Sequence, residues 1–304
     1  MNKKLLFVYN PKAGKALIKN KLADILDVFA GAGYEITVAP TRRQGDAVEA
    51  VAGRRREYDL VVCSGGDGTL DEVVTGMIRS GFRTPIGYIP AGSTNDFGGS
   101  LSLPKNMVQA AEVIVEGRDF PCDIGSFSDS DGEDVFVYIA AFGIFTDVSY
   151  ETAQDMKNVL GHMAYLLEGM KRLSSIRSYH VKVSWEENEV EDDFVFGMVT
   201  NSTSVGGFKN ITGKNVQMDD GVFEVTLIKS PRNPVELNNI MVSLLNRDID
   251  TNSIYSFRTA ELTLESEEPL AWTLDGENGG SHTKTTIRNV CKGIDIRVGN
   301  PPSK

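Results

Sequence analysis

The residues best suited to chemistry form a glycine-rich stretch, SGGDGTL, at positions 64–70. It follows an apolar run at 60–63 that is typical of a buried strand, and a helical pattern begins directly after it. Closely spaced glycines allow backbone N–H groups to approach an anion, and the N-terminus of a helix adds a favourable dipole. This order of strand, glycines and helix predicts a phosphate-binding loop.

Asp67 distinguishes this loop from other phosphate loops, because its carboxylate repels phosphate unless Mg²⁺ or an acceptor hydroxyl lies between them. The spacing matches neither G-x-G-x-x-G nor G-x-x-x-x-G-K followed by Ser or Thr. The common dinucleotide fold and the P-loop NTPases are therefore poor matches. A tight strand-to-helix turn without a ligand is the alternative interpretation.

Two further loops have the same placement. NPKAGK at 10–15 follows an apolar strand pattern at 5–9, and PAGSTNDF at 90–97 follows another at 85–89. Their lysines, hydroxyls and Asn-Asp pair suit phosphate, metal or a polar headgroup, although the same residue types also cap helices. Because open α/β sheets bind ligands at the carboxyl ends of their strands, the three loops together predict one shared site.

Three aspartates, Asp67, Asp96 and Asp123, are spaced as if each ends a different strand at one cleft. Carboxylates in such a position suit a Mg²⁺ and water network that bridges the phosphates of a nucleotide. Three separate helix or turn caps are the alternative.

The fold class is predicted from the order of the patterns. Up to residue 123, strands and helices alternate, which favours a doubly wound, parallel α/β domain at 1–123. The remainder, 124–304, carries alternating strand patterns, among them 134–141 and 179–185, separated by Gly, Asp and Asn turns. An antiparallel β-sandwich is the natural packing.

Composition narrows the class of protein. The 304 residues carry a formal charge of −11, which disfavours nucleic acid as a partner. No window approaches the roughly 20 apolar residues of a membrane span, and the N-terminus lacks a signal pattern, so we expect a cytoplasmic protein. The three cysteines have no C-x-x-C spacing, which favours reduced, buried thiols over a disulfide framework or a zinc site.

The segments NPKAG, SGGDGTLDEV and PAGSTNDF together resemble the catalytic domain of the diacylglycerol kinase family, specifically its soluble bacterial lipid kinases. The resemblance continues through 120–125, 140–147, 219–225 and 274–277 and so covers nearly the whole chain. One departure is Ser93, which stands where the third motif of the family usually has Thr. The hydroxyl is retained, and we expect nucleotide binding to survive.

The resemblance also implies the same two-domain arrangement, with the last residues returning to the first domain, and it implies roles for individual residues. Nucleotide binding falls on Thr41 and on residues of the first three motifs, namely Asn10, Gly65, Gly66, Asp67, Gly68, Thr69, Leu70, Asp71 and Ser93. The LDGE motif at 274–277 would supply the general base for a lipid hydroxyl, either Asp275 or Glu277, and we favour Asp275; a plain acidic turn is the alternative. Asp220, with the carbonyls of Gln217 and Val222, would hold a structural Mg²⁺, and an Asx turn without metal is the alternative.

A helical pattern at 152–173 carries an apolar stripe rich in Met. A helix packed on the sandwich is one interpretation. Contact with an acyl chain or a membrane is the other, with Lys157, Lys171 and Arg172 at the level of the headgroups.

Together with the resemblance, these patterns predict an ATP- and Mg²⁺-dependent lipid kinase that transfers the γ-phosphoryl group to a diacylglycerol-like hydroxyl and yields phosphatidic acid. We expect it to act transiently at the inner face of the membrane. A phosphatidylglycerol or sphingoid acceptor is one alternative, and a soluble-substrate kinase resembling NAD kinase is another. A sensing module without turnover is disfavoured by the retained carboxylates. The oligomeric state is open, with a homodimer as one arrangement.

Overall fold

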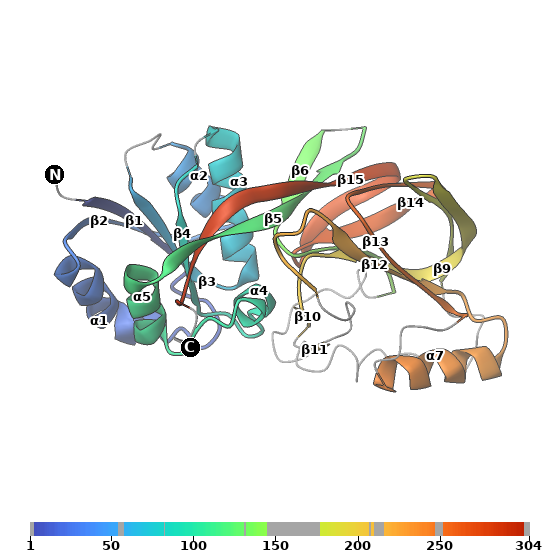
Figure 1. Ribbon diagram of the computed structural model, residues 1–304, viewed down its shortest axis with the longest axis horizontal. Helices are drawn as coiled ribbons and strands as arrows, with labels where there is room; N and C mark the ends of the chain where they lie inside the picture. The colour runs from blue at the N-terminus through green and yellow to red at the C-terminus, as the bar shows by residue number, and fades with distance from the viewer. Residues whose placement is uncertain are drawn as a thin grey trace. The chain divides into compact units, whose positions relative to one another are not determined.

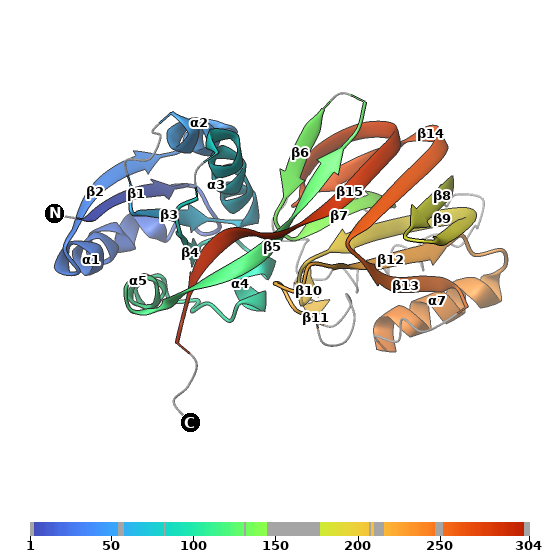
Figure 2. The same cartoon turned by 45° about the horizontal axis from the view of Figure 1, so that its top comes forward.

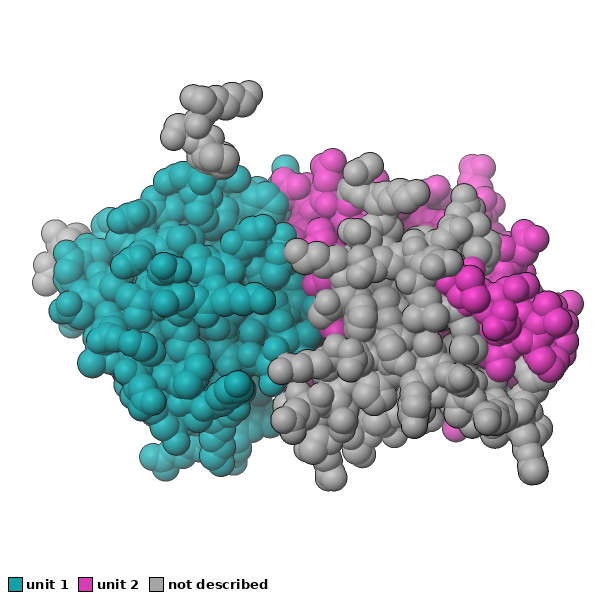
Figure 3. Space-filling view, turned by 90° about the horizontal axis from the view of Figure 1, so that it is seen from below, with its two compact units in different colours: residues 1–123, 292–304 teal, residues 124–291 magenta. Residues whose placement is uncertain are grey.

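The computed structural model of the chain describes residues 3–53, 58–81, 83–130, 132–144, 177–206, 208–209, 216–246 and 252–300. It divides into two compact units (Figure 3). Residues 1–123 and 292–304 form unit 1, and residues 124–291 form unit 2. The Met-rich segment predicted at 152–173 lies outside the described residues.

Unit 1 contains a parallel sheet whose strands follow the order β2-β1-β3-β4 (Figure 1). Their bounds are Lys3–Tyr9 for β1, Tyr34–Pro40 for β2, Leu60–Gly65 for β3 and Ile86–Pro90 for β4. Every residue of β3 and β4 is buried. A parallel strand covered on both faces needs apolar side chains on both, which explains the continuous apolar runs.

Five helices accompany this sheet within the described part of unit 1. Their bounds are Ile18–Gly31 for α1, Asp46–Ala52 for α2, Asp67–Ser80 for α3, Asp96–Ser100 for α4 and Met107–Glu116 for α5. Helix α1 packs against α5, and α2 packs against α3 (Figures 1 and 2). The α1–α5 pair shares a core with Leu5 and Phe7 of β1, while Leu6 and Val8 on the other face of that strand are equally buried.

The last strand, β15 (Glu277–Val298), brings its C-terminal end into unit 1. There Ile296 pairs in parallel with Ile86 of β4. Asp295 accepts two hydrogen bonds from the guanidinium of Arg83, at 2.6 and 2.9 Å. Unit 1 is therefore completed by residues that are distant in sequence from the rest of it.

Unit 2 is built from antiparallel strands. Their bounds are Arg118–Ser128 for β5, which begins in unit 1, Glu133–Phe136 for β6, Ile139–Gly143 for β7, Tyr179–Trp185 for β8, Asn188–Thr200 for β9, Ser204–Val205 for β10, Phe208–Lys209 for β11, Phe223–Lys229 for β12, Ile254–Thr259 for β13 and Glu261–Leu274 for β14. Helix α7 spans Pro234–Asn246.

The strands of unit 2 pair in a closed circuit. Strand β9 pairs with both β7 and β8, and β14 pairs with the same two strands. Aromatic side chains fill the interior, where Trp272 contacts Phe127 and Phe142 with ring centroids 5.1 Å apart in each pair. One core of aromatic and aliphatic side chains serves all of these strands.

Two details differ from the expectations. Cys63 and Cys122 are buried cysteines outside any disulfide, as expected, but Cys291 is exposed. The strand expected at 134–141 is divided into β6 and β7, because the N–H groups of Val137 and Tyr138 bond to a side chain instead of to a neighbouring strand. Among the described residues, no helix is long and apolar enough to cross a membrane.

Candidate active site

The glycine-rich loop joins β3 to α3. Strand β3 ends at Gly65, Gly66 is the extended residue before the helix, and Asp67 is the first helical residue. A side chain at Gly65 has no room, since a Cβ there would lie 2.4 Å from the side chain of Thr69. The first N–H groups of a helix have no intrahelical acceptor, so the start of α3 offers donors and a positive dipole end to an anion.

Backbone hydrogen bonds join the ends of the four parallel strands. The N–H of Asn10 donates to Ser64 O at 2.9 Å, and the N–H of Thr41 donates to Tyr9 O at 2.9 Å. The N–H of Ala91 donates to Gly65 O at 2.8 Å. The predicted nucleotide residues of the first three motifs therefore stand on one edge of the sheet, at the carboxyl ends of its strands.

Close glycine contacts pack the three loops together. A Cβ on Gly14, whose φ is +52°, would lie 2.5 Å from Ala91 O, and a Cβ on Gly92 would lie 2.6 Å from the Cα of Gly66. These distances are shorter than real Cβ contacts, so the loops approach closely only because both residues lack side chains.

We expect Gly92→Ala to raise the KM for ATP at least about tenfold and to destabilise the protein by roughly 1–3 kcal/mol, the usual cost of overpacking. The physical reason is that the added methyl group forces the loop away from Gly66. Steady-state kinetics with thermal unfolding measure both effects. Gly99→Ala is the matched control, because a Cβ there meets no atom within 4 Å. Equal KM values for Gly92→Ala and Gly99→Ala would contradict the prediction.

Two of the three predicted aspartates are in direct contact. The N–H of Asp96 donates to Oδ2 of Asp67 at 3.2 Å, and Asp96 is buried. Burial, and after it the charge of Asp67, raises the pKa of the Tyr88 hydroxyl well above its ordinary value. The same hydroxyl contacts Gly65 O and Oδ1 of Asn95, each at 3.3 Å. The structure thus brings Asp67 and Asp96 together beside a neutral phenol.

The third aspartate, Asp123, is fully buried on β5. Its Oδ1 accepts a hydrogen bond from the N–H of Lys292 at 2.6 Å. Asp123 therefore also ties β5 to β15, a structural contact that the sequence did not reveal.

The remaining nucleotide candidates differ in exposure. Leu70 is buried, so its contribution to a ligand would have to come from its backbone, whereas Ser93 is exposed. Thr41 is buried beside Tyr9. Thr69, Gly68 and Asp71 are half-buried on the first turns of α3.

Three residues shape this edge by contacts that the sequence did not show. Tyr88 and Asn95 hold the third loop, where Oδ1 of Asn95 accepts the N–H of Gly92 at 2.9 Å. Glu72 accepts the N–H groups of Gly45 and Ala47 at 2.9 and 3.1 Å and so caps α2. The available signal was positional, because Glu72 and Asn95 lie inside the motifs and Tyr88 lies two positions before PAGSTNDF.

The two LDGE carboxylates have different surroundings within unit 2. Asp275 is 4% exposed and accepts three backbone N–H bonds, from Val137 at 2.5 Å and from Tyr138 and Ile139 at 3.0 Å each. Glu277 is exposed. Hydrogen bonds to a carboxylate favour its charged form, so Asp275 has the character of an anchor for the turn, and Glu277 is the more accessible carboxylate.

Asp220 lies in the turn before β12. Its Oδ1 accepts the N–H of Val222 at 3.3 Å, as in an Asx turn, and its Oδ2 forms an ion pair with Arg258. The guanidinium also contacts Oε1 of Glu224 at 3.2 Å. Burial raises the pKa of Glu224 to about 7, although Arg258 acts in the opposite direction. The predicted Mg²⁺ ligation by Gln217, Asp220 and Val222 stays a prediction.

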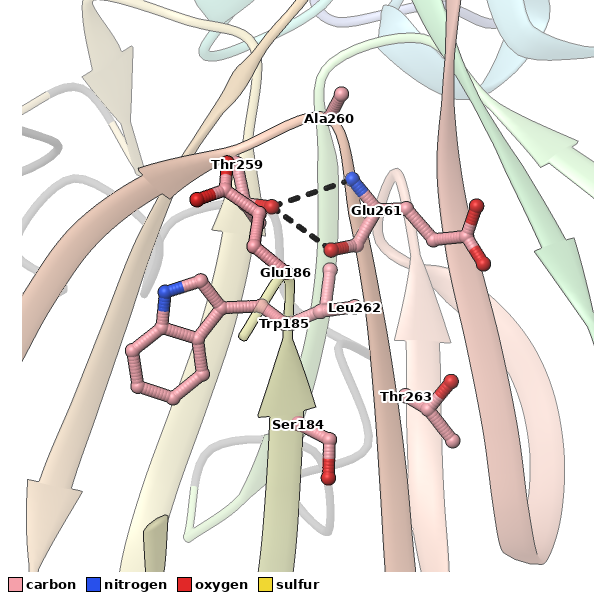
Figure 4. Close-up of a pocket in the computed structure, with 8 residues that line it drawn as sticks. All are labelled: Ser184, Trp185, Glu186, Thr259, Ala260, Glu261, Leu262 and Thr263. Atoms are coloured by element: carbon pink, nitrogen blue, oxygen red, sulfur yellow. Dashed lines mark hydrogen bonds between the residues drawn. The ribbon is translucent and has the colours of Figure 1, made fainter. Parts of the chain in front are cut away.

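A pocket of about 440 Å³ opens in unit 2 beside the turns that join β8 to β9 and β13 to β14 (Figure 4). Trp185 lies on its wall and stacks on Phe257 with ring centroids 3.9 Å apart. The hydroxyl of Thr259 holds the second turn through Glu261, as the dashed lines in Figure 4 mark. Because Glu186 and Glu261 line this pocket, it is poorly suited to a phosphate group, and none of the predicted site residues lines it.

Comparison with known proteins agrees with the two units. Residues 4–127 match the diacylglycerol kinase catalytic domain, and residues 140–295 match the YegS C-terminal NAD kinase beta sandwich-like domain. A diacylglycerol kinase of Bacillus subtilis (strain 168) is 32% identical over 280 residues, 91% of each chain. The chain belongs to the diacylglycerol kinase family. Membership makes it a lipid kinase that uses ATP as the phosphoryl donor.

Other members of the family extend the match over the whole length. A diacylglycerol kinase of Staphylococcus aureus (strain JH9) is 32% identical over 304 residues, 99% of this chain and 94% of its own. A solved structure from Bacillus anthracis str. Sterne, assigned to the diacylglycerol kinases, is 26% identical with a TM-score of 0.82, over 98% of this chain and 96% of its own. The two-domain architecture, with a β-sandwich at the C-terminal end, is thus a family property.

Proposed function

We propose that this kinase transfers the γ-phosphoryl group of ATP to the hydroxyl of a diacylglycerol-like lipid and yields phosphatidic acid. The observation that carries the proposal is the junction of three motif loops around Asp67 at the carboxyl edge of a parallel sheet. The names of the relatives support the acceptor class.

We also propose that unit 1 is doubly wound. The strand order β2-β1-β3-β4 supports this, because the chain leaves β1 in one direction for β2 and in the other for β3. The crevice of such a sheet opens at that reversal, beside Asn10 and Gly65. The nucleotide would bind there, its phosphates facing the N–H groups at the start of α3.

Asp67 and Asp96 are the candidate Mg²⁺ ligands, because carboxylates are hard oxygen donors and the N–H of Asp96 donates to Oδ2 of Asp67. Asp123 enters the proposed network from its place in the sequence, since the described residues contain no group of three His, Cys, Asp or Glu side chains gathered as for a metal ion. When bound, the ion neutralises charge on the β- and γ-phosphates. Tyr88 stays protonated beside these carboxylates, since its raised pKa keeps the hydroxyl a donor.

The general base of the reaction is proposed to come from the LDGE motif. A base must reach the acceptor hydroxyl and accept its proton. The burial of Asp275 and its three N–H bonds oppose that role, so our proposal reverses the sequence-based preference and assigns the base to Glu277, with Asp275 as the residue that positions the turn.

The acceptor lipid implies action at a membrane surface by peripheral contact. We propose a cytoplasmic enzyme that visits the inner face of the membrane and has no nucleic-acid partner, which its charge of −11 supports. A homodimer stays a prediction.

The test is an assay with ATP labelled in the γ-position, Mg²⁺ and mixed micelles that contain a diacylglycerol, phosphatidylglycerol or a sphingoid base. A parallel arm contains NAD without micelles. We expect label in the organic-extractable product of the diacylglycerol arm. If only NAD is labelled, or if another lipid is labelled in preference to the diacylglycerol, that compound replaces diacylglycerol as the proposed acceptor.

A further inference from the structure

The acidic residues at the turn before β12 are paired with an arginine of the same unit. Asp220 and Glu224 converge on one guanidinium, that of Arg258, which reaches them from the neighbouring strand β13. Glu224 is only 5% exposed, and a buried carboxylate requires a compensating partner. Arg258 supplies that partner to both acids at once.

A structural Mg²⁺ at this turn, as the family resemblance implies, does not fit this arrangement. Oδ2 of Asp220 faces the guanidinium, and Oδ1 accepts the N–H of Val222. A divalent ion beside the same carboxylate would meet the positive charge of Arg258 at close range. Both oxygens of the Asp220 carboxylate are therefore already engaged by protein groups.

We propose that Arg258 takes the place of a divalent cation at the Asp220 turn, so that this turn is stable without Mg²⁺. The register of two strands fixes the arrangement. Pairing of Glu224 with Arg258 across β12 and β13 sets the guanidinium beside both acids. The proposal is independent of the phosphoryl-transfer reaction, since it concerns the stability of unit 2.

The same geometry predicts the effect of removing the guanidinium. Two acidic side chains, one of them buried, would then lie close together without a counter-ion, and carboxylate oxygens are the ligands that hard divalent cations prefer. Mg²⁺ should bind there only in the absence of Arg258.

The test is thermal unfolding of the full chain without nucleotide, in EDTA or in millimolar Mg²⁺ at equal ionic strength. We compare the wild type with Asp220→Asn, Arg258→Met and the double variant. Arg288→Met is the matched control, because Arg288 forms an exposed ion pair with Glu261 in the same unit. Met keeps an apolar side chain at each position while removing its charge.

We expect the wild type and Asp220→Asn to show the same Tm response to Mg²⁺. Arg258→Met should lose at least roughly 2–4 °C in EDTA relative to Arg288→Met and regain it in Mg²⁺. The double variant should not regain it. A Mg²⁺-dependent rise in the wild type that Asp220→Asn abolishes would overturn the proposal. So would an Arg258→Met variant that loses no more than the control, or that Mg²⁺ does not rescue.

Discussion

Asp67→Asn is expected to lower phosphoryl transfer by at least about 10³-fold, equivalent to about 4 kcal/mol of transition-state stabilisation. The carboxylate stands at the first position of α3, inside the phosphate loop, and contacts the N–H of Asp96. Replacement by Asn retains an oxygen that can accept this N–H but removes the charge that a bound cation needs. The loss should therefore fall mainly on kcat.

The measurement is steady-state turnover together with thermal unfolding. Stability should change by no more than about 1 kcal/mol, the typical contribution of a negative charge at a helix N-terminus. Asp24→Asn is the control, because Asp24 is an exposed acid on α1 that pairs only with Lys21 among the contacts described. A folded Asp67→Asn variant with wild-type turnover would remove Asp67 from the catalytic machinery.

The second large effect separates the LDGE carboxylates. Glu277→Gln should lower kcat by roughly 10²- to 10⁴-fold, the usual contribution of a general base, with little change in the KM for ATP or in Tm. Asp275→Asn should lower both kcat and stability. Its amide places an N–H₂ group or a weaker acceptor against three buried N–H donors, which costs about 1–3 kcal/mol.

The Tm of each variant shows whether the replaced residue acts as the base or positions the turn. The general base would be Asp275 if Asp275→Asn lost its kcat while keeping the wild-type Tm, and if Glu277→Gln had nearly wild-type kcat. Losses below about tenfold in both folded variants would mean that neither carboxylate takes the proton. Glu267→Gln, at an exposed position on β14, controls for the removal of an acid from the β14–β15 hairpin.

Much of the candidate site is readable from local sequence. An apolar run at 60–63 followed by glycines and Asp67 specifies strand, turn and helix within a dozen residues, and the structure has β3 and α3 there. The same holds for Asn10, at the end of β1. Helix α4 was not predicted, because its five residues include two glycines and are too few for a helical period.

Non-local contacts decided the rest. Asp275 accepts hydrogen bonds from the N–H groups of Val137 and Tyr138, which lie more than 130 positions away in the chain. These bonds divide the single strand predicted at 134–141 into β6 and β7. The burial of Asp275, which disfavours it as a base, comes from the same bonds. No local pattern at 274–277 contains this information.

Sequence by itself determined which residue types stand at the ends of the parallel strands, because backbone preferences and apolar periodicity act over a few residues. Only the tertiary structure decided which donor or cation each of these carboxylates meets. Asp67 contacts Asp96, Asp123 contacts Lys292, and Asp220 contacts Arg258. The reason is physical: a charge removed from water must be compensated by whichever group the packing brings to it, and packing joins segments that are far apart in the chain.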